Sequence, residues 1–156
     1  MGAGELQVRA ESPGGPVGHA VRARFWAEAA AVTGLALGDG PPASDLVDLV
    51  APSGAFVVAV RDGEPLGCVG VRELTGGEVE VKRLFVVPAA RGLGVGRRLL
   101  GWCADWARER GAGRLVLDTH GALTAARALY LSVGFVEVER YNDNPHAQHW
   151  YALTLA

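Results

Sequence analysis

The sequence predicts a single α/β domain: a mixed, mostly antiparallel sheet of about seven strands, with helices on both faces and a central parallel pair. Its 156 residues match the length of one domain, which is roughly 150 residues. Segments with strand patterning alternate with segments whose apolar residues keep helical spacing. A crossover of helical length joins two buried strands, and such a connection implies that they run parallel. No internal repeat, low-complexity tract or domain boundary interrupts residues 1–156.

Composition narrows the function classes. The hydrophobic fraction of 49% supplies enough apolar side chains for one buried core. Fifteen basic residues oppose 17 acidic ones, a net charge of −2, which argues against a nucleic-acid partner bound through bulk charge. The chain has no apolar run of about 18 residues and no signal-like start, so we expect a soluble, cytoplasmic protein without a membrane partner. Cys68 and Cys103 each lie in an apolar run and are expected to be buried free thiols.

The N-terminal third predicts one strand and two helices. Residues 6–10 alternate apolar and polar side chains, which indicates a short strand. An alanine-rich helix is expected over 17–33, with Gly34 as its C-terminal cap. After a connection rich in glycine and proline, Ser44 is placed to cap a short helix that reaches Val50.

The middle of the chain predicts a hairpin and a buried strand. Residues 55–61 and 65–73 flank Asp62-Gly63, a dipeptide typical of tight hairpin turns. Residues 78–87 form the next strand, which alternates at first and is then wholly apolar, so its second half is expected to be buried on both faces.

The rest of the chain supplies the crossover and the end of the sheet. A helix is expected from the glycine-rich loop to Arg110, with an inner stripe of Val95, Leu99, Trp102, Cys103 and Trp106. A short strand over 115–117, a helix over 123–133 and two terminal strands over 135–140 and 149–155 follow.

The glycine-rich loop is the candidate ligand site. Gly92, Gly94 and Gly96 alternate between a strand and the start of a helix. Amides without side chains around them can wrap a pyrophosphate, the helix N-terminus adds partial positive charge, and three arginines add full charges. Those arginines are Arg91, Arg97 and Arg98. The loop therefore predicts a nucleotide-like cofactor, with a flexible turn as the alternative.

Two other phosphate motifs are poor matches. The dinucleotide pattern G-x-G-x-x-G needs a third glycine where the chain has Arg97 in one register and Leu99 in the other. A P-loop needs Gly-Lys-Ser/Thr after the glycines, which is absent from the sequence. Asp118 lies at a strand end about 20 residues beyond the loop, as a dinucleotide site requires, so that reading remains an alternative.

The loop resembles the signature of the GNAT superfamily of acyl-CoA-dependent N-acyltransferases, Arg/Gln-x-x-Gly-x-Gly/Ala. Arg91-Gly92-Leu93-Gly94-Val95-Gly96 matches every position. Residues 84–88, 115–119 and 126–135 resemble the flanking strands and the next motif of the family, so the likeness covers nearly the whole chain. The resemblance implies one GNAT-like domain over 1–156 that uses acetyl-CoA as co-substrate and needs no metal. Dimerisation is common in this superfamily, so a homodimer is compatible with the resemblance. An asparagine common near the start of the family's fourth helix has no counterpart at 123–125.

The resemblance also implies cofactor contacts. Backbone groups of Phe85, Val86 and Val87 would pair with the pantetheine arm and polarise the thioester carbonyl. The amides of Gly92, Leu93, Gly94, Val95, Gly96 and Arg97 would hold the pyrophosphate. One of Arg91, Arg97 and Arg98 would reach the ribose phosphate.

Two residues receive catalytic roles from the same resemblance. Tyr130 stands at the position of the general acid that protonates the departing CoA thiolate. Glu80 lies on the strand from which the family often draws its base. A water chain or His120 are the alternatives for that base. The amine would attack the thioester directly, because neither cysteine stands where its thiol pKa would be lowered for an acyl-enzyme route.

The acceptor is expected to be a primary amine of a small molecule or peptide. The polar loop with Tyr141, Asn142 and Asp143, together with Asp45 and Asp48, is predicted to border its pocket, and the acidic groups would suit a cationic amine. His146 and His149 lack the further ligands that a metal site needs. A non-catalytic acyl-CoA sensor on the same scaffold remains the binding-class alternative.

Overall fold

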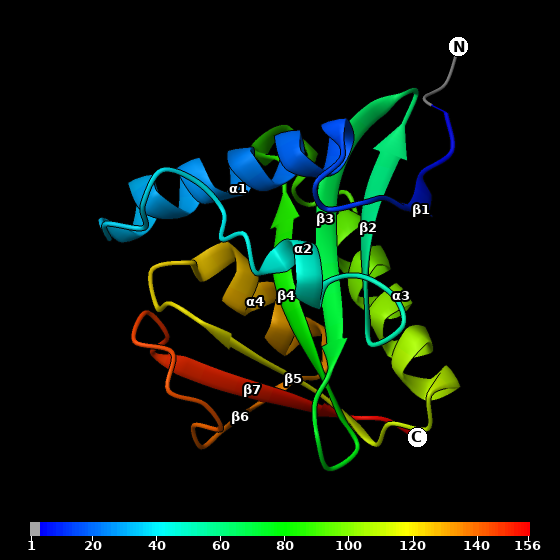
Figure 1. Cartoon of the computed structure of the whole chain (residues 1–156), viewed down its shortest axis with the longest axis vertical. Helices are drawn as coiled ribbons and strands as arrows, with labels where there is room; N and C mark the ends of the chain where they lie inside the picture. The colour runs from blue at the N-terminus through cyan, green and yellow to red at the C-terminus, as the bar shows by residue number, and fades with distance from the viewer. Residues whose placement is uncertain (1–3) are drawn as a thin grey trace.

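The computed structural model describes residues 4–156 and contains one seven-stranded sheet in the order β1-β2-β3-β4-β5-β7-β6 (Figure 1). Of the strand pairs formed by these residues, β4 and β5 alone run parallel. The predicted fold class is therefore confirmed. The strands are β1 (Gln7–Ala10), β2 (Gly54–Arg61), β3 (Glu64–Glu73), β4 (Glu78–Val86), β5 (Arg114–Thr119), β6 (Val136–Val138) and β7 (His149–Thr154), and the helices are α1 (Pro16–Thr33), α2 (Asp45–Asp48), α3 (Val95–Glu109) and α4 (Thr124–Val133).

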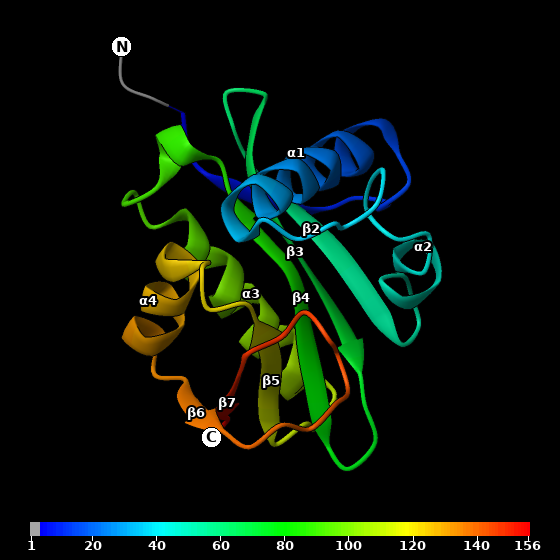
Figure 2. The ribbon, with the colours of Figure 1, turned by 90° about the vertical axis from the view of Figure 1, so that its left-hand side faces the viewer.

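Helices cover both faces of the sheet. α1 and α2 lie on one face and α3 lies on the other, with α4 beside α3 (Figures 1 and 2). Two glycines of β3 mark the two sides, because a Cβ on Gly70 would meet Leu49 near α2, whereas one on Gly67 would meet the α3 residue Leu99. The inner stripe predicted for α3 packs on the sheet, although Trp102 is only partly buried.

Local turn chemistry sets several boundaries. Asp62 and Gly63 have φ angles of 52° and 79°, the left-handed pair that a tight hairpin requires, so the predicted turn between β2 and β3 is confirmed. Gly34, with φ of 72°, ends α1 as predicted. The buried free thiols expected at Cys68 and Cys103 are confirmed, and burial raises the pKa of both. Within residues 4–156, no helix is long and apolar enough to cross a membrane.

Two predicted elements are shorter than expected. α2 is a single turn that ends at Asp48 rather than near Val50. Ser44 does not cap it: the backbone of Ser44 is itself helical, and its side chain accepts no hydrogen bond from the first turn. β6 stops at Val138 rather than near Arg140. The chain then leaves the edge of the sheet and passes over β5 (Figure 2), where its asparagines bind Asp118.

β4 and β5 part soon after they meet. They are paired only where Glu78, Val79 and Glu80 face residues 114–116. Beyond that point the pairing of β4 with β3 shifts in register, and Arg83 takes a φ of 58°. Such a bulge bends a strand and re-aims its side chains. The bulge therefore separates the carboxyl ends of the two parallel strands and opens space between them.

The crossing of β2 beneath α2 gives a test of packing. A Cβ on Gly54 would lie 2.1 Å from the carbonyl oxygen of Asp48, and this backbone cannot yield as a flexible side chain can. We expect Gly54→Ala to lower the free energy of unfolding by about 1–3 kcal/mol. Gly101→Ala in α3 is the matched control, because a Cβ on Gly101 would meet no atom within 4 Å. This substitution should raise the free energy of unfolding by about 0.5–1 kcal/mol. Urea denaturation measures both, and a neutral Gly54→Ala would contradict the close approach.

Candidate active site

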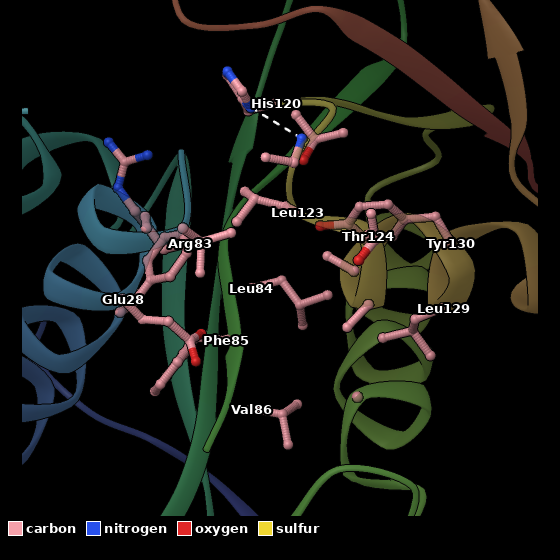
Figure 3. A pocket seen from close by; sticks show the side chains of 18 of the residues that line it. Glu28, Arg83, Leu84, Phe85, Val86, His120, Leu123, Thr124, Leu129 and Tyr130 are labelled. Carbon is pink, nitrogen blue, oxygen red and sulfur yellow. Dashed lines mark hydrogen bonds between the residues drawn. The ribbon is translucent and has the colours of Figure 1, made fainter. Parts of the chain in front are cut away.

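A cavity of about 910 Å³ occupies the space where β4 and β5 diverge. Its walls come from α1, the second half of β4, the glycine-rich loop with the start of α3, the end of β5, α4 and the loop between β6 and β7. Figure 3 shows the side chains of Leu84 and Val86 between β4 and α4, with Leu129 and Tyr130 opposite. The cavity is thus elongated along β4, from Lys82 to the glycine-rich loop.

The glycine-rich loop ends in a free helix N-terminus. Gly94 has a φ of 83° and occupies the N-cap position of α3. The first bond within the helix runs from the amide of Arg98 to the carbonyl of Gly94, so the amides of residues 95–97 have no partner inside it. A Cβ on Gly96 would lie 2.4 Å from a methyl group of Leu129, so glycine at this position lets α3 approach α4 closely. The arrangement presents amide donors to an anion in the cavity.

The three loop arginines are not equivalent. Arg91 lines the cavity, where it donates to the carbonyl of Val86 at 3.1 Å and to Glu28 of α1. Arg97 also lines it and donates to the hydroxyl of Ser132. Arg98 and the 59% exposed Leu93 lie outside the cavity lining. Two of the three predicted arginines are therefore placed to meet an anion there.

Of the three β4 residues predicted to contact the cofactor, only Val86 directs its main-chain groups toward the free edge of the strand. The amide of Val87 donates to the carbonyl of Leu66 in β3 at 2.9 Å. Because main-chain groups alternate in direction along a strand, those of Phe85 also face β3 and those of Val86 face the open edge. The carbonyl of Val86 accepts from Arg91, which lies on that edge.

Tyr130 reaches the cavity from α4. Its ring is 5% exposed and packs against Phe135 and Tyr151. Its hydroxyl makes no hydrogen bond with the described part of the chain and points toward β4 in Figure 3. Burial, followed by the nearby charge of Asp118, raises the pKa of this phenol. Tyr130 therefore carries its proton at neutral pH and holds it in the cavity.

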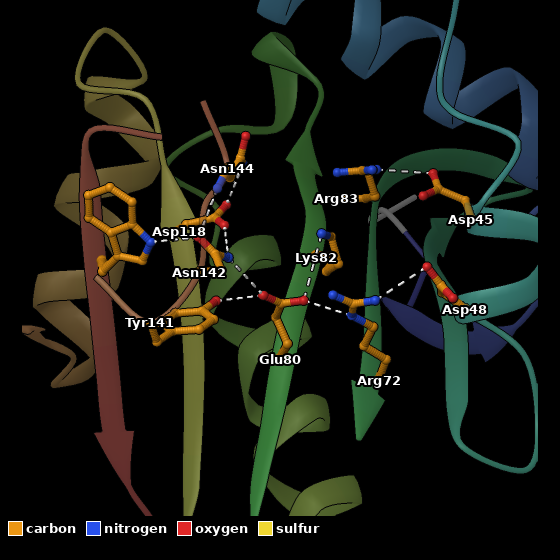
Figure 4. Close-up of polar contacts among 11 residues, drawn as sticks. Asp45, Asp48, Arg72, Glu80, Lys82, Arg83, Asp118, Tyr141, Asn142 and Asn144 are labelled. Carbon is orange, nitrogen blue, oxygen red and sulfur yellow. Dashed lines mark hydrogen bonds and ion pairs between the residues drawn. The ribbon is translucent and has the colours of Figure 1, made fainter. Parts of the chain in front are cut away.

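Glu80 is the centre of a polar network outside the cavity lining (Figure 4). Its carboxylate is 1% exposed and accepts from Arg72 at 2.8 Å and from the hydroxyl of Tyr141 at 2.6 Å. Burial by itself raises the pKa of Glu80, but Lys82, the Tyr141 hydrogen bond and Arg72 together outweigh burial and lower it. A carboxylate that is enclosed, hydrogen-bonded and weakly basic is poorly suited to remove a proton from an amine.

The predicted acceptor loop turns inward at its first residues. Tyr141 binds Glu80, while Asn142 donates to Asp118 at 2.6 Å and accepts from the Trp150 indole at 2.9 Å (Figure 4). These two residues and the exposed Asp143 do not line the cavity, whereas Asn144, His146 and Ala147 of the same loop do. The loop therefore borders the cavity through its second half, and the contacts predicted for its first half remain a prediction.

The acidic groups expected beside the acceptor are engaged elsewhere. Asp45 is 2% exposed and lies between Arg22 and Arg83, each at 3.0 Å. Asp48 pairs with Arg72. Neither aspartate lines the cavity, and the place predicted for them beside the acceptor remains a prediction. Local sequence could not show the pairing of Asp45, because the arginines that bind it lie 23 and 38 residues away.

The histidines near the cavity are poorly placed to act as a base or as metal ligands. His120 lines it, but its Nδ1 accepts the amide of Ala122 at 3.0 Å (Figure 3). The neutral ring then carries its proton on Nε2 and donates rather than accepts there. His149 instead binds Glu137, apart from the cavity-lining His146. Residues 4–156 contain no cluster of three or more groups suited to a metal ion.

Sequence reasoning overlooked several residues that line the cavity. Lys82 and Arg83 lie in β4 and Trp26 and Glu28 lie in α1, and none of the four belongs to a motif that points to the site. Their position depends on the bulge in β4 and on the packing of α1. An odd break in the alternation at Lys82-Arg83 was the one available signal.

Comparisons with known proteins match this arrangement. A protein-family model described as "Acetyltransferase (GNAT) family" matches residues 12–135. An "IAA acetyltransferase" of Azospirillum brasilense is 44% identical over 108 residues, covering 65% of this chain and 70% of the relative. The chain spans 29% to 70% of the length of the curated relatives it matches.

Solved structures show the same fold. A GNAT-family acetyltransferase of Staphylococcus aureus superposes with a TM-score of 0.82 at 18% identity. The match covers 97% of this chain and 100% of the other. A structure described as a streptothricin acetyltransferase of Bacillus anthracis in complex with acetyl coenzyme A superposes with a TM-score of 0.62 at 19% identity, covering 70% of this chain and 66% of that one.

Proposed function

Because the chain belongs to the acetyltransferase (GNAT) family, we propose that it transfers an acetyl group from acetyl-CoA to a primary amine of a small molecule or peptide. Family membership confirms the predicted enzyme class, an acyltransferase. The donor, the acceptor and the residue roles are the proposal. Relatives named for streptothricin and for aminoglycosides support a small-molecule amine as acceptor.

One observation carries the proposal: the cavity along β4 joins an anion-binding end to a protonated phenol. At the first end lie the free amides of residues 95–97, with Arg91 and Arg97. Farther along lie the open edge of β4 at Val86 and the hydroxyl of Tyr130. An extended cofactor with its pyrophosphate on the loop would run along β4 and bring its thioester toward Tyr130.

The chemistry follows from that placement. The amine nitrogen attacks the thioester carbonyl carbon, a C–N bond forms, and the carbonyl oxygen becomes an oxyanion. The amide of Val86, on the open strand edge, is the main-chain donor available to that oxyanion. The C–S bond then breaks, and Tyr130 transfers its proton to the departing thiolate. The phenolate is restored by a proton from water.

The proton lost by the amine goes to water at the mouth of the cavity. Glu80 does not line the cavity and His120 donates through Nε2, so neither presents a free basic atom there. We propose that Glu80 acts as a positioning residue, since it holds Tyr141 and Arg72 in place behind β4.

Titration calorimetry of the purified protein with acetyl-CoA tests the cofactor, with NAD and NADP run alongside at fixed salt. We expect micromolar affinity for acetyl-CoA and none for the dinucleotides. Arg97→Gln should weaken acetyl-CoA binding about tenfold, because it removes a charged donor from the cavity wall. Arg98→Gln is the matched control, because Arg98 lies outside that wall, and this substitution should change the affinity less than about twofold.

Other outcomes separate the alternatives. Equal losses in the two variants would contradict the placement of the pyrophosphate. Preference for NAD or NADP would favour the dinucleotide reading. Tight binding of acetyl-CoA without release of free thiol for any amine would favour the sensor reading.

A further inference from the structure

Positive charge lines both ends of the cavity. Of the described residues, four cations line it, Lys82, Arg83, Arg91 and Arg97, against the two carboxylates of Glu28 and Asp118. Arg91 and Arg97 flank the glycine-rich loop, where the cofactor's phosphates would lie. Lys82 and Arg83 belong to the opposite end, earlier in β4 and beyond the reach of the phosphates. The phosphates of a bound cofactor would therefore leave this second pair of cations uncontacted.

Arg83 is held in an unusual conformation at that end. Its φ of 58° is rare for a residue with a side chain, and such strain concentrates at functional sites. Its Nε donates to Asp45 at 3.0 Å, and its guanidinium lies 5.2 Å from the ring centre of Trp26. Its two terminal nitrogens make no hydrogen bond with residues 4–156. The guanidinium is thus anchored on one side and has free donors on the other.

The anchor does not neutralise Arg83. Asp45 is shared with Arg22, whose remaining donors bind the carbonyls of Pro13 and Pro42. Two guanidinium groups and one buried carboxylate leave a net positive charge beside the cavity. Figure 4 shows the side chain of Asp45 reaching toward Arg83.

Lys82 adds a second cation, which is paired with Glu80 only at long range. Its ammonium group lies 3.7 Å from Glu80, too far for a hydrogen bond, and Glu80 already accepts from Arg72 and Tyr141. Nearby Asp118, the one carboxylate lining this end among the described residues, receives amide hydrogen bonds from Asn142 and Asn144 on its two oxygens. This end of the cavity therefore offers free donors rather than free acceptors.

We infer that the acceptor is an amine that also carries a carboxylate, as a free amino acid does, and that Arg83 and Lys82 bind this carboxylate. The inference rests on the proposed function, because it assigns the acceptor of the same reaction. A guanidinium with its two terminal nitrogens free suits a carboxylate through paired hydrogen bonds. A polyamine without an anionic group would meet like charge there. On this inference the side chains around the acceptor are basic, whereas the sequence suggested partly acidic ones.

Matched substrate pairs test the inference. The twenty common L-amino acids and their primary amides are compared as acceptors by release of free thiol from acetyl-CoA, with spermidine as a polycation. We expect the best amino acid to exceed its own amide in kcat/KM by roughly ten- to hundredfold. Preference for the amides or for spermidine would overturn the inference.

Variants assign the preference to the two residues. Lys82→Gln and Arg83→Gln should each raise the KM for the amino acid and reduce the preference for acid over amide, with the affinity for acetyl-CoA unchanged by calorimetry. Arg83→Lys should restore part of the preference. If Arg83→Gln folds poorly because it breaks the buried ion pair with Asp45, Lys82→Gln still tests the inference, since it leaves that pair intact. An acid preference that survives both glutamine variants would overturn the assignment.

The design separates this inference from the proposed function. Failure to bind acetyl-CoA would remove the proposed function itself. Binding of acetyl-CoA with no turnover of any amino acid would overturn the inference and leave the donor half of the proposed function standing. Turnover of the amino-acid amides alone would support the proposed acetyltransferase function and overturn the inference that the acceptor carries a carboxylate.

Discussion

Tyr130→Phe is expected to lower kcat by a factor of about 10² to 10⁴, with the affinity for acetyl-CoA unchanged. The substitution removes the hydroxyl that faces the cavity and leaves the ring that packs against Phe135 and Tyr151. Because burial raises the pKa of this phenol, it is protonated at neutral pH and holds the proton that the thiolate requires. Thiol release at saturating amine measures kcat, and calorimetry measures the affinity.

Tyr151→Phe is the matched control for the loss of a buried hydroxyl. The Tyr151 hydroxyl accepts from Arg127 at 3.1 Å, and Tyr151 lies outside the cavity lining. We expect this variant to lose some stability and to keep its kcat. If Tyr130→Phe keeps the wild-type kcat, Tyr130 is not the general acid; if both variants lose activity equally, the loss comes from packing.

Glu80→Ala is expected to lower the free energy of unfolding by about 2–3 kcal/mol. Removing one partner of a buried ion pair costs about 3–5 kcal/mol, and the value here is smaller because water reaches the Arg72 side chain, which is 34% exposed. The variant also leaves the Tyr141 hydroxyl without its acceptor. Glu80→Gln keeps an oxygen that accepts from these donors and should lose less. Urea denaturation measures both, and equal stability of wild type and Glu80→Ala would contradict the role of the network.

The same residue predicts a pH dependence. Its pKa is lowered in the folded state, so its contribution to stability is present above the ordinary glutamate pKa of about 4.3 and is lost as the pH falls through the folded value. Below about pH 4 the wild type should therefore lose stability more steeply than Glu80→Gln. The pH profile of kcat/KM distinguishes the two roles considered for Glu80. If Glu80 only positions other residues, the profile of Glu80→Gln keeps its fall at low pH; if Glu80 is the general base, that fall disappears.

Much of the fold was predictable because its signals are local. The Asp62-Gly63 turn, the end of α1 at Gly34 and the glycine-rich loop before α3 each depend on backbone conformations that only a few residue types adopt readily. The helical crossover between β4 and β5 determined their parallel pairing. The anion-binding end of the cavity follows from the same stretch of sequence, since one loop supplies the amides and two of the lining cations.

The end of the cavity at Lys82 and Arg83 was decided by the tertiary structure. Asp45 looked like a pocket residue on a short helix, yet it is buried because Arg22 and Arg83, distant in sequence, converge on it. Tyr141 and Asn142 looked like a substrate loop, yet they fold inward onto Glu80 and Asp118. The resemblance of the glycine-rich loop to the GNAT signature determined the enzyme class, and the same loop determined which backbone amides face the cavity. The bulge in β4 and long-range ion pairing decided which charges line the other end of the cavity, because a side chain's direction depends on partners that no local pattern specifies.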